Sequence, residues 1–489
     1  MMGVQQPQSS LFYVGFNLEQ RVRKDHPLRR VDELIDFDFV YKEVKDLYGA
    51  NGNVSVPPPV ILKLMLLLVF YNVRSERELM QTVPERLDWL WFLGFDLDSK
   101  IPNHSVLSKA RRKWGVEVFR SFFERIVIQC VEAGLVDGSK IFVDSSLIDA
   151  DASNDSVIDT KNLKNQMLQN FKTLEARLEE RCDSTDSSKT EKANHRYIST
   201  TDPDAAIVKR GKPKLSYQTH RAVDGKHEII TAVETTPGDV NEAHVMLPLL
   251  DQHEATTATE VHTVVADGKY GTVDNFLACH DRGIEAHIPD LGKTASKRTA
   301  KRGIFSEEQF IYDPVSDNYI CPAGNTLQPK SFHKRLQALV YRGSRKTCKC
   351  CSLRQSCTQD KSGRTVTRHL RQAELEQMRR KSRSIKSKRD IKTRQHLMER
   401  SFARATRYGF DRARWRGLWR MRIQEYLVCA IQNIQVFINC MLRPKKGATP
   451  GSAAAKTSNL CQMLPSVIFF LNFALASRSL GCRFDFQRA

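Results

Sequence analysis

The sequence lacks an apolar run long enough to cross a membrane. Its longest apolar stretches, residues 60–71 and 463–476, fall short of the roughly 20 residues that a spanning helix needs. The first ten residues carry neither the charge nor the apolar segment of a secretory signal, and no internal repeat is visible. We therefore expect a cytoplasmic protein with no membrane partner.

Acidic residues are scarce relative to basic ones. The chain has 56 Asp and Glu against 76 Lys and Arg, so its formal net charge is +20. An excess of this size favours a polyanionic partner, and nucleic acid is the first candidate. Residues 361–422 alone hold 21 Lys and Arg against 5 Asp and Glu. Such a run can be a solvated helix face or a tail, but Trp415 and Trp419 within it and Tyr426 just after it recur at helical spacing and predict a packed helix.

The 12 cysteines indicate thiols or metal ligands rather than disulfides if the compartment is reducing. Five of them fall in one segment: Cys321, Cys348, Cys350, Cys351 and Cys357. Cys348 and Cys351 have the C-x-x-C spacing of a zinc site. Zn²⁺ held by Cys321, Cys348, Cys351 and Cys357, with Cys350 spare, is one interpretation. Unligated thiols are the other, because the remaining pair is spaced more widely than usual.

At 489 residues the chain has room for two or three domains of roughly 100–200 residues each. Residues 56–115 have a helical pattern, with Ser75 as a candidate cap and a last short helix that ends in Arg111, Arg112 and Lys113. That basic helix predicts insertion into a DNA groove. An ordinary helical bundle with a basic surface remains the alternative.

The middle of the chain predicts a mixed α/β sheet. An apolar strand at residues 140–143 ends at Asp144, and a second at 261–266 ends at Asp267. Between them, Asp224 and Gly225 divide two alternating runs and indicate a hairpin. A helix is expected at residues 162–182 and an exposed loop at 183–192. The order strand, hairpin, helix, strand, helix, strand is typical of an α/β core.

The two strand-end aspartates are candidate metal ligands. Ligands collect beyond the carboxyl ends of strands in open α/β sheets, so both carboxylates are expected to face one crevice. Carboxylate oxygens suit Mg²⁺, and paired ions can stabilise the attacking and leaving oxygens at a phosphate. Either aspartate taken alone could instead be a cap or turn residue.

Several stretches together resemble the DDE-type transposases of bacterial insertion sequences, in the branch with a cysteine-bearing insertion. The resemblance extends from about Phe12 to Gln435. The quoted motifs are Asp25-His26-Pro27-Leu28-Arg29, Pro102-Asn103-His104-Ser105, Val143-Asp144-Ser145, Tyr217-Gln218-Thr219-His220-Arg221, Ala266-Asp267-Gly268-Lys269-Tyr270-Gly271 and Cys321-Pro322-Ala323-Gly324.

The resemblance also supplies a third acid. Met398-Glu399-Arg400-Ser401-Phe402 is similar to the family's final helix, where an acid precedes Phe by three residues, while Glu425 resembles a downstream packing residue. Related enzymes often carry Arg four residues before the acid and Lys seven after it. This chain has Gln395 and Thr406 at those places, with Arg394 and Arg407 each one position away, so DNA contacts there are expected to differ.

By resemblance, the core is ribonuclease H-like and Asp144, Asp267 and Glu399 hold Mg²⁺ or Mn²⁺. Arg111, Arg112, Lys113, Arg394 and Arg407 are expected to bind double-stranded DNA, and the active form is expected to be a homodimer. The expected domains are a helical DNA-binding domain (1–135), a catalytic core (136–290 and 370–442), a cysteine-rich insertion (291–369) and a flexible tail (443–489). A DNA-binding repressor without catalysis and a nuclease that cuts without joining are the competing hypotheses.

Overall fold

The computed structural model describes residues 2, 17–49, 54–160, 197–210, 212–290 and 303–442. The helix expected at 162–182, the loop at 183–192, the first twelve residues of the expected insertion (291–302) and the tail after residue 442 lie outside the described residues. Among the described helices, none is both long enough and apolar enough to cross a bilayer.

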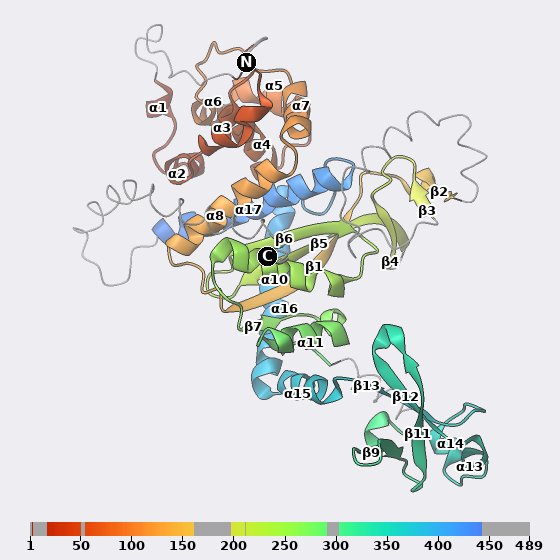
Figure 1. Ribbon diagram of the computed structural model, residues 1–489. Helices are drawn as coiled ribbons and strands as arrows, with labels where there is room; N and C mark the ends of the chain where they lie inside the picture. Colours follow the sequence, from red (N-terminus) through yellow and green to blue (C-terminus); the bar gives the residue numbers. More distant parts are fainter. Residues whose placement is uncertain are drawn as a thin grey trace, which may run out of the picture. The chain divides into compact units, whose positions relative to one another are not determined.

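The N-terminal domain is helical, as the sequence predicts (Figure 1). Pro58 opens its most apolar helix in the first turn, where its missing N–H costs nothing. Ser75 caps the next helix, because its hydroxyl accepts a hydrogen bond from the Glu78 amide at 3.1 Å. The helices are α1 (Leu18–Arg21), α2 (Pro27–Leu34), α3 (Phe39–Val44), α4 (Pro58–Phe70), α5 (Glu76–Thr82), α6 (Leu87–Leu93), α7 (Ser105–Trp114) and α8 (Glu117–Glu132).

The core is a mixed six-stranded sheet in the order β4-β5-β1-β7-β8, with β6 also paired to β5. β1 runs antiparallel to β5 and parallel to β7, and β7 runs parallel to β8. The predicted hairpin at Asp224 and Gly225 is confirmed as the β5–β6 connection. The strands are β1 (Lys140–Asp149), β4 (Ala206–Arg210), β5 (Lys212–Asp224), β6 (Ile230–Pro237), β7 (Thr263–Val265) and β8 (Glu285–His287).

One strand is longer than predicted. β1 continues five residues beyond Asp144 to Asp149, because the whole segment pairs with β5, from Ile141 opposite Asp224 to Asp149 opposite Ser216. The prediction that this strand ends at Asp144 was therefore wrong, and Asp144 lies within β1. A separate short ribbon pairs β2 (Val157–Asp159) with β3 (Tyr197–Ser199).

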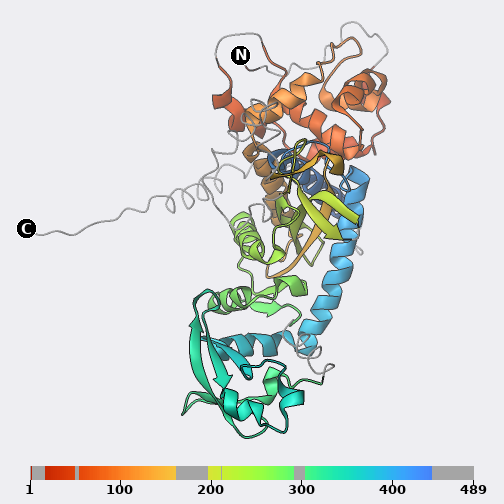
Figure 2. The same cartoon turned by 90° about the vertical axis from the view of Figure 1, so that its right-hand side faces the viewer.

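Helices cover both faces of the sheet. Alternate β1 side chains point to opposite faces, so Ile141 and Val143 pack with α10 (Met246–Thr257) and α11 (Val273–Asp281). Phe142 points the other way and shares a core with α16 (Ile385–Ala405) and α17 (Leu418–Leu442). Figure 2 shows α16 as the long light-blue helix, and it packs against β1, β7 and β8.

The cysteine-rich insertion lies between β8 and α15 (Gln372–Ser382). It folds as an antiparallel sheet in the order β13-β12-β11-β10-β9 with two short helices. Its own buried core is small: Phe310, Tyr319, Leu327, Tyr341 and Val366. The elements are β9 (Ile311–Asp313), β10 (Asn318–Ile320), β11 (Thr326–His333), β12 (Ala338–Gly343), α13 (Arg345–Lys349), α14 (Arg354–Cys357) and β13 (Thr365–His369).

Candidate active site

Asp144 and Asp267 lie close together at one edge of the parallel strands. β1 and β7 pair in register with Phe142 opposite Val265. Two residues further along the sequence, β1 reaches Asp144 and the segment after β7 reaches Asp267. Burial raises the pKa of Asp144 above its ordinary value, and the nearby carboxylate of Asp267 adds to that rise. The structure thus brings together the two acids that were predicted from separate strand ends.

Helix α16 contributes a basic residue to this edge. The Arg394 guanidinium Nη1 donates to Asp144 Oδ2 at 2.5 Å, and its charge lowers the pKa of Asp144 against the larger effect of burial. Four residues earlier on the same helix, Asp390 Oδ2 lies 2.7 Å from Nδ1 of the buried His287 on β8. Because residues four apart share a helix face, these contacts hold one face of α16 against the sheet.

Glu399 lies further along α16 and is exposed. Its carboxylate Oε1 accepts a hydrogen bond from Gln395 Nε2 at 3.1 Å. The carboxylates that act most strongly on Asp144 belong to Asp267 and Glu242. Glu399, the third predicted acid, is therefore on the helix that covers the site. Its carboxylate contacts Gln395 of the same helix.

Glu242 is an acid at this edge that sequence reasoning missed. It is 6 % exposed and accepts hydrogen bonds from Lys269 Nζ at 2.6 Å and Gln218 Nε2 at 2.7 Å. The sequence predicts a helix over residues 242–250, whereas the structure has a 3₁₀ turn at Glu242–His244 before α10. Glu242 does not directly follow a strand, because a turn with Asn241 as its cap separates it from β6. An acid in that place has no signal of the kind that Asp144 and Asp267 have.

Buried polar groups surround the acids. Gln218 Nε2 also donates to Ser145 Oγ at 2.7 Å, and the Tyr270 hydroxyl lies 3.4 Å from His220 Nδ1. Burial lowers the pKa of His220 to about 3 and raises that of Tyr270 well above its ordinary value. Both groups are therefore neutral near pH 7, and they frame the edge without adding charge to it.

The five predicted DNA-binding residues differ in exposure, and one of them, Arg394, binds Asp144 as described above. Arg111 is 3 % exposed, forms an ion pair with Glu76 and stacks over Trp415 with its guanidinium carbon 4.0 Å from the ring centre. Arg111 therefore joins α7 to α5 and to the segment before α17, and its side chain is too buried to contact DNA. Arg112, Lys113 and Arg407 are exposed and remain candidates.

Glu425 is buried in packing, as its resemblance to the family's downstream packing residue implies. Its Oε2 lies 3.1 Å from Nη2 of Arg221, and both side chains are at most 1 % exposed. Arg221 also stacks over Phe402 and Phe410. This pair joins α17 to β5 in the interior and leaves Glu425 unable to reach a metal at the edge of the sheet.

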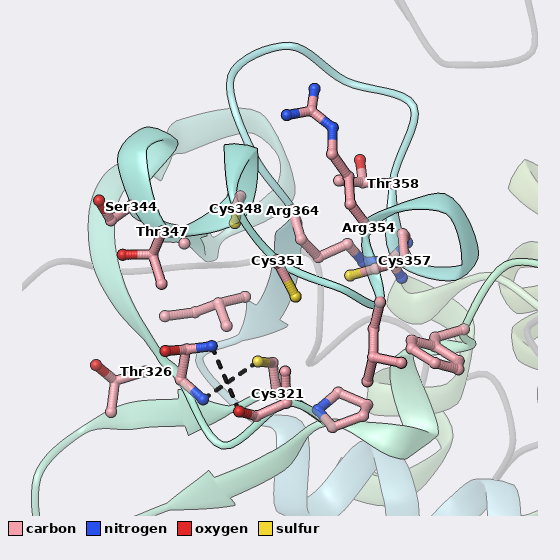
Figure 3. Close-up of a pocket in the computed structure, with 17 residues that line it drawn as sticks. Cys321, Thr326, Ser344, Thr347, Cys348, Cys351, Arg354, Cys357, Thr358 and Arg364 are labelled. Carbon is pink, nitrogen blue, oxygen red and sulfur yellow. Dashed lines mark hydrogen bonds between the residues drawn. The ribbon is translucent and has the colours of Figure 1, made fainter.

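Four cysteines of the insertion line one pocket (Figure 3). They are the four that the sequence singled out: Cys321, Cys348, Cys351 and Cys357. Cys350 is exposed and is not among the lining residues. Burial raises the pKa of the Cys357 thiol, and the other three cysteines raise it further while Arg364 lowers it. The four thiols are thus electrostatic neighbours.

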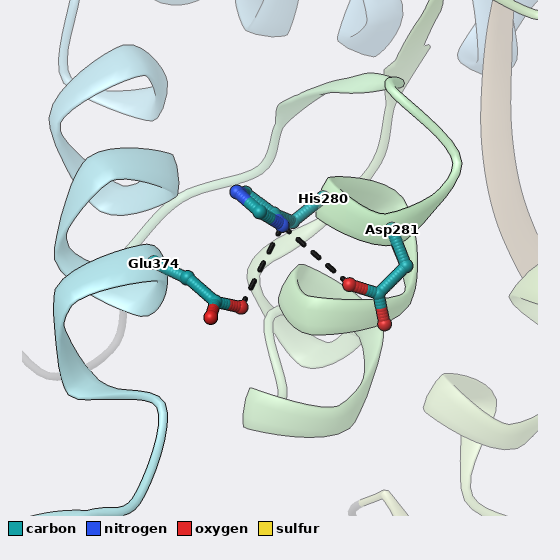
Figure 4. A group of neighbouring side chains, drawn as sticks. All are labelled: His280, Asp281 and Glu374. Carbon is teal, nitrogen blue, oxygen red and sulfur yellow. Dashed lines mark hydrogen bonds and ion pairs between the residues drawn. The ribbon is translucent and has the colours of Figure 1, made fainter.

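A different group has metal-like spacing among the described residues: His280, Asp281 and Glu374 (Figure 4). His280 Nδ1 lies 3.5 Å from the Asp281 carboxylate and 3.6 Å from that of Glu374. Arg371, however, already forms ion pairs with both carboxylates, and its side-chain hydrogen bond lowers the pKa of Asp281 to about 2. We interpret the group as an ion-pair network between α11 and α15.

Comparison with family models identifies the chain. A model described as a transposase domain (DUF772) matches residues 16–113, and one described as a transposase DDE domain matches residues 320–438. The first ends at Lys113, and the second includes Glu399 and the four pocket cysteines. Together they define a transposase.

The two matches support a DDE-type insertion-sequence transposase. No curated protein and no solved structure matches it. The mixed α/β core is confirmed by the sheet itself, whereas its ribonuclease H-like identity stays a prediction.

Proposed function

We propose that this chain is an active transposase that cuts DNA at the ends of an insertion sequence and joins those ends to target DNA. The observation that carries the proposal is the adjacency of Asp144 and Asp267 where β1 and β7 run side by side. The basic character of the helix above them, with Arg394 already on Asp144, supports a polyanionic substrate at this edge.

Asp144, Asp267 and Glu399 are the proposed ligands of Mg²⁺ or Mn²⁺, because hard divalent ions prefer carboxylate oxygens. When bound, a pair of such ions activates the attacking oxygen and stabilises the leaving one. Water first cleaves a phosphodiester and leaves a 3′ hydroxyl, which then attacks a phosphodiester of the target. A separate zinc site is proposed in the insertion and has no part in this chemistry.

Arg394 is proposed to change partners during this cycle. Its guanidinium neutralises Asp144, and a divalent cation at Asp144 would repel it. A DNA phosphate is the natural new partner, since guanidinium binds phosphate oxygens in the same bidentate way as carboxylate. Glu399 lies five residues further along α16, about 7.5 Å along the axis at 1.5 Å per residue. At 3.6 residues per turn it also lies about 140° around the helix from Arg394, so α16 has to rotate as well as shift for the Glu399 carboxylate to reach the two aspartates.

Arg112, Lys113 and Arg407 are proposed to contact the DNA backbone and to fix its register without reading sequence. Two chains are proposed to hold the two ends of the element. A cytoplasmic location stays a prediction.

The experiment uses DNA with a pre-cut element end and a supercoiled target plasmid. An active transposase joins the end to the plasmid, a nuclease cuts without joining, and a repressor binds without either reaction. Asp144→Asn, Asp267→Asn and Glu399→Gln should each lower joining by at least about 100-fold, which is the scale of losing one electrostatic contact to a transition state. DNA binding should persist in all three variants.

Glu242 provides a sharp comparison with Glu399. If Glu242 only positions Lys269 and Gln218, Glu242→Gln should lower joining less than Glu399→Gln does. Abolished joining in Glu242→Gln together with normal joining in Glu399→Gln would transfer the third-ligand role to Glu242. Normal joining in the Asp144 or Asp267 variant would overturn the proposed chemistry.

A further inference from the structure

The insertion brings four thiols together from three separate places along the chain. Cys321 follows β10, Cys348 lies on α13, Cys351 follows that helix and Cys357 ends α14. All four line the pocket shown in Figure 3. Cys350, which lies next to Cys351 in sequence, is exposed and outside the pocket.

One backbone group in the pocket favours a thiolate, that of Cys321. The Asn325 amide donates to Cys321 Sγ at 3.3 Å, in a tight turn that Gly324 makes with φ +76°. A donated N–H stabilises the charged form of an acceptor. Room is also left for the sulfur of Cys348, since a Cβ added at Gly343 or Gly363 would lie 2.9 Å or 3.4 Å from it.

The insertion also needs a stabilising element beyond its apolar core. Five buried side chains form that core, and small units with so little buried surface usually depend on a metal or on disulfides. The four cysteines are unpaired. A metal held by these thiols would supply that stabilisation.

We propose that Cys321, Cys348, Cys351 and Cys357 bind one structural Zn²⁺ ion that holds the base of the β11–β12 hairpin against α13 and α14. The hairpin base contributes Leu327 and Gly343 to the pocket wall. Among the described residues, no three of these sulfurs lie within 4.8 Å of one another. Zn–S bonds of about 2.3 Å would therefore draw the pocket walls inward.

The test is the metal content of the untagged full-length protein after dialysis against a mild chelator. Wild type should retain about one zinc ion per chain. Cys351→Ser and Cys357→Ser should lose most of it, and the matched control Cys350→Ser should keep it. Asp144→Asn should also keep it, which separates this site from the proposed catalytic one.

A second measurement covers variants that fail to fold. Wild type loaded with Co²⁺ should show the intense absorption of tetrahedral thiolate coordination, and zinc release should expose four additional reactive thiols. Wild type without bound zinc and without the cobalt spectrum would overturn the proposal. So would equal zinc loss in Cys350→Ser and Cys351→Ser.

A different observation concerns the tip of the same hairpin. Residues 326–343 contain no Asp or Glu, and the exposed tip holds Lys330, Lys334 and Arg335. Two large apolar side chains are exposed among them, Phe332 at 44 % and Leu336 at 55 %. Positive charge interleaved with exposed apolar groups matches a DNA groove, where basic residues contact phosphates and apolar ones wedge between bases.

We infer that this hairpin tip binds DNA, an inference that rests on the proposed function. Lys334→Ala combined with Arg335→Ala should weaken DNA binding and reduce the slope of log affinity against log salt by about 2, or about 1 per lost phosphate contact. The charge-conserving swap Lys334→Arg with Arg335→Lys should leave the slope unchanged. An unchanged slope in the alanine variant overturns this inference alone, whereas a wild type that binds no DNA overturns the proposed function.

Discussion

Two arginines of the core show how differently one charge can be used. Arg221 is fully buried against Glu425, and its role is to connect the sheet with the last helix. Arg394 is 12 % exposed and bound to Asp144, where a cation or a phosphate can compete for either partner. The first pair is a fixed part of the fold, and the second can be exchanged.

Removing the charge of Glu425 should destabilise the fold strongly. Glu425→Gln leaves Arg221 buried without a counter-charge, which typically costs about 3–5 kcal/mol. The free energy of unfolding in urea would measure this. The control is Glu33→Gln, which breaks the more exposed Arg30–Glu33 pair (2.9 Å) and should cost less than about 1 kcal/mol. Equal costs in the two variants would contradict the distinction.

Removing the charge of Arg394 should tighten metal binding. Arg394→Gln frees Asp144 from its guanidinium partner, so Mn²⁺ affinity should rise by about tenfold, which corresponds to about 1.4 kcal/mol. Titration calorimetry would measure it, with Arg400→Gln as the control, because Arg400 binds Glu228 on the hairpin instead. Unchanged or weaker Mn²⁺ binding in Arg394→Gln would show that the guanidinium does not compete with the ion.

Among the elements, the turn after α16 depends on one glycine. Gly409 has φ +75°, and a Cβ there would lie 2.5 Å from Asn72 Oδ1 and 2.7 Å from Arg414 Nη2. Arg414 in turn donates to the carbonyl of Val73 at 2.6 Å. The turn therefore has to fit closely against the N-terminal domain.

Gly409→Ala should lower the free energy of unfolding by more than the left-handed backbone conformation alone accounts for. Gly134 provides a matched control, with φ +71° and no atom within 4 Å of an added Cβ. Gly134→Ala should cost about 1 kcal/mol, and Gly409→Ala about 1–3 kcal/mol more, as overpacking does. Equal thermal shifts in the two variants would mean that the neighbours move aside freely.

Among the elements, the features that local chemistry determines were predicted correctly from the sequence. The Asp-Gly turn and the Ser75 cap follow from short-range geometry, and both are present. The end of β1 was misplaced, because pairing with β5 extends it through polar residues. A local apolar pattern contains no information about such long-range pairing.

For the site, the sequence found the two aspartates but missed their polar surroundings. Asp144 and Asp267 each follow an apolar run, which is a local signal. Glu242 has no such signal, and only the fold brings it to the same edge. The burial of Arg111 depends on Trp415 and Glu76, which lie far from it along the chain, so its basic neighbours in sequence suggested a surface role instead.

At the scale of the whole molecule, buried histidine makes stability depend on pH. The pKa of His220 is about 3 in the fold and about 6.5 in an unfolded chain. Between these values the unfolded state binds the extra proton, so stability is lost as pH falls below 6.5 and is unaffected above it. The expected loss from pH 7.5 to 5.5 is about 1.4 kcal/mol.

His220→Gln should remove that part of the acid sensitivity. Denaturant unfolding at the two pH values should show a drop about 1.4 kcal/mol smaller in the variant than in wild type. His227→Gln changes an exposed histidine and should behave as wild type. The same pH dependence in all three proteins would rule out His220 as the proton-linked group.

The buried pair of Arg221 and Glu425 joins positions 204 residues apart, with the insertion and all of α16 between them. During synthesis, β5 emerges long before the helix that supplies its counter-charge. Until the ribosome has made α17, Arg221 has no buried counter-charge, and the sheet face that carries Asp144 is covered by α16 without α17. We therefore expect a truncated product that ends before α17 to be degraded by proteases rather than to cut DNA.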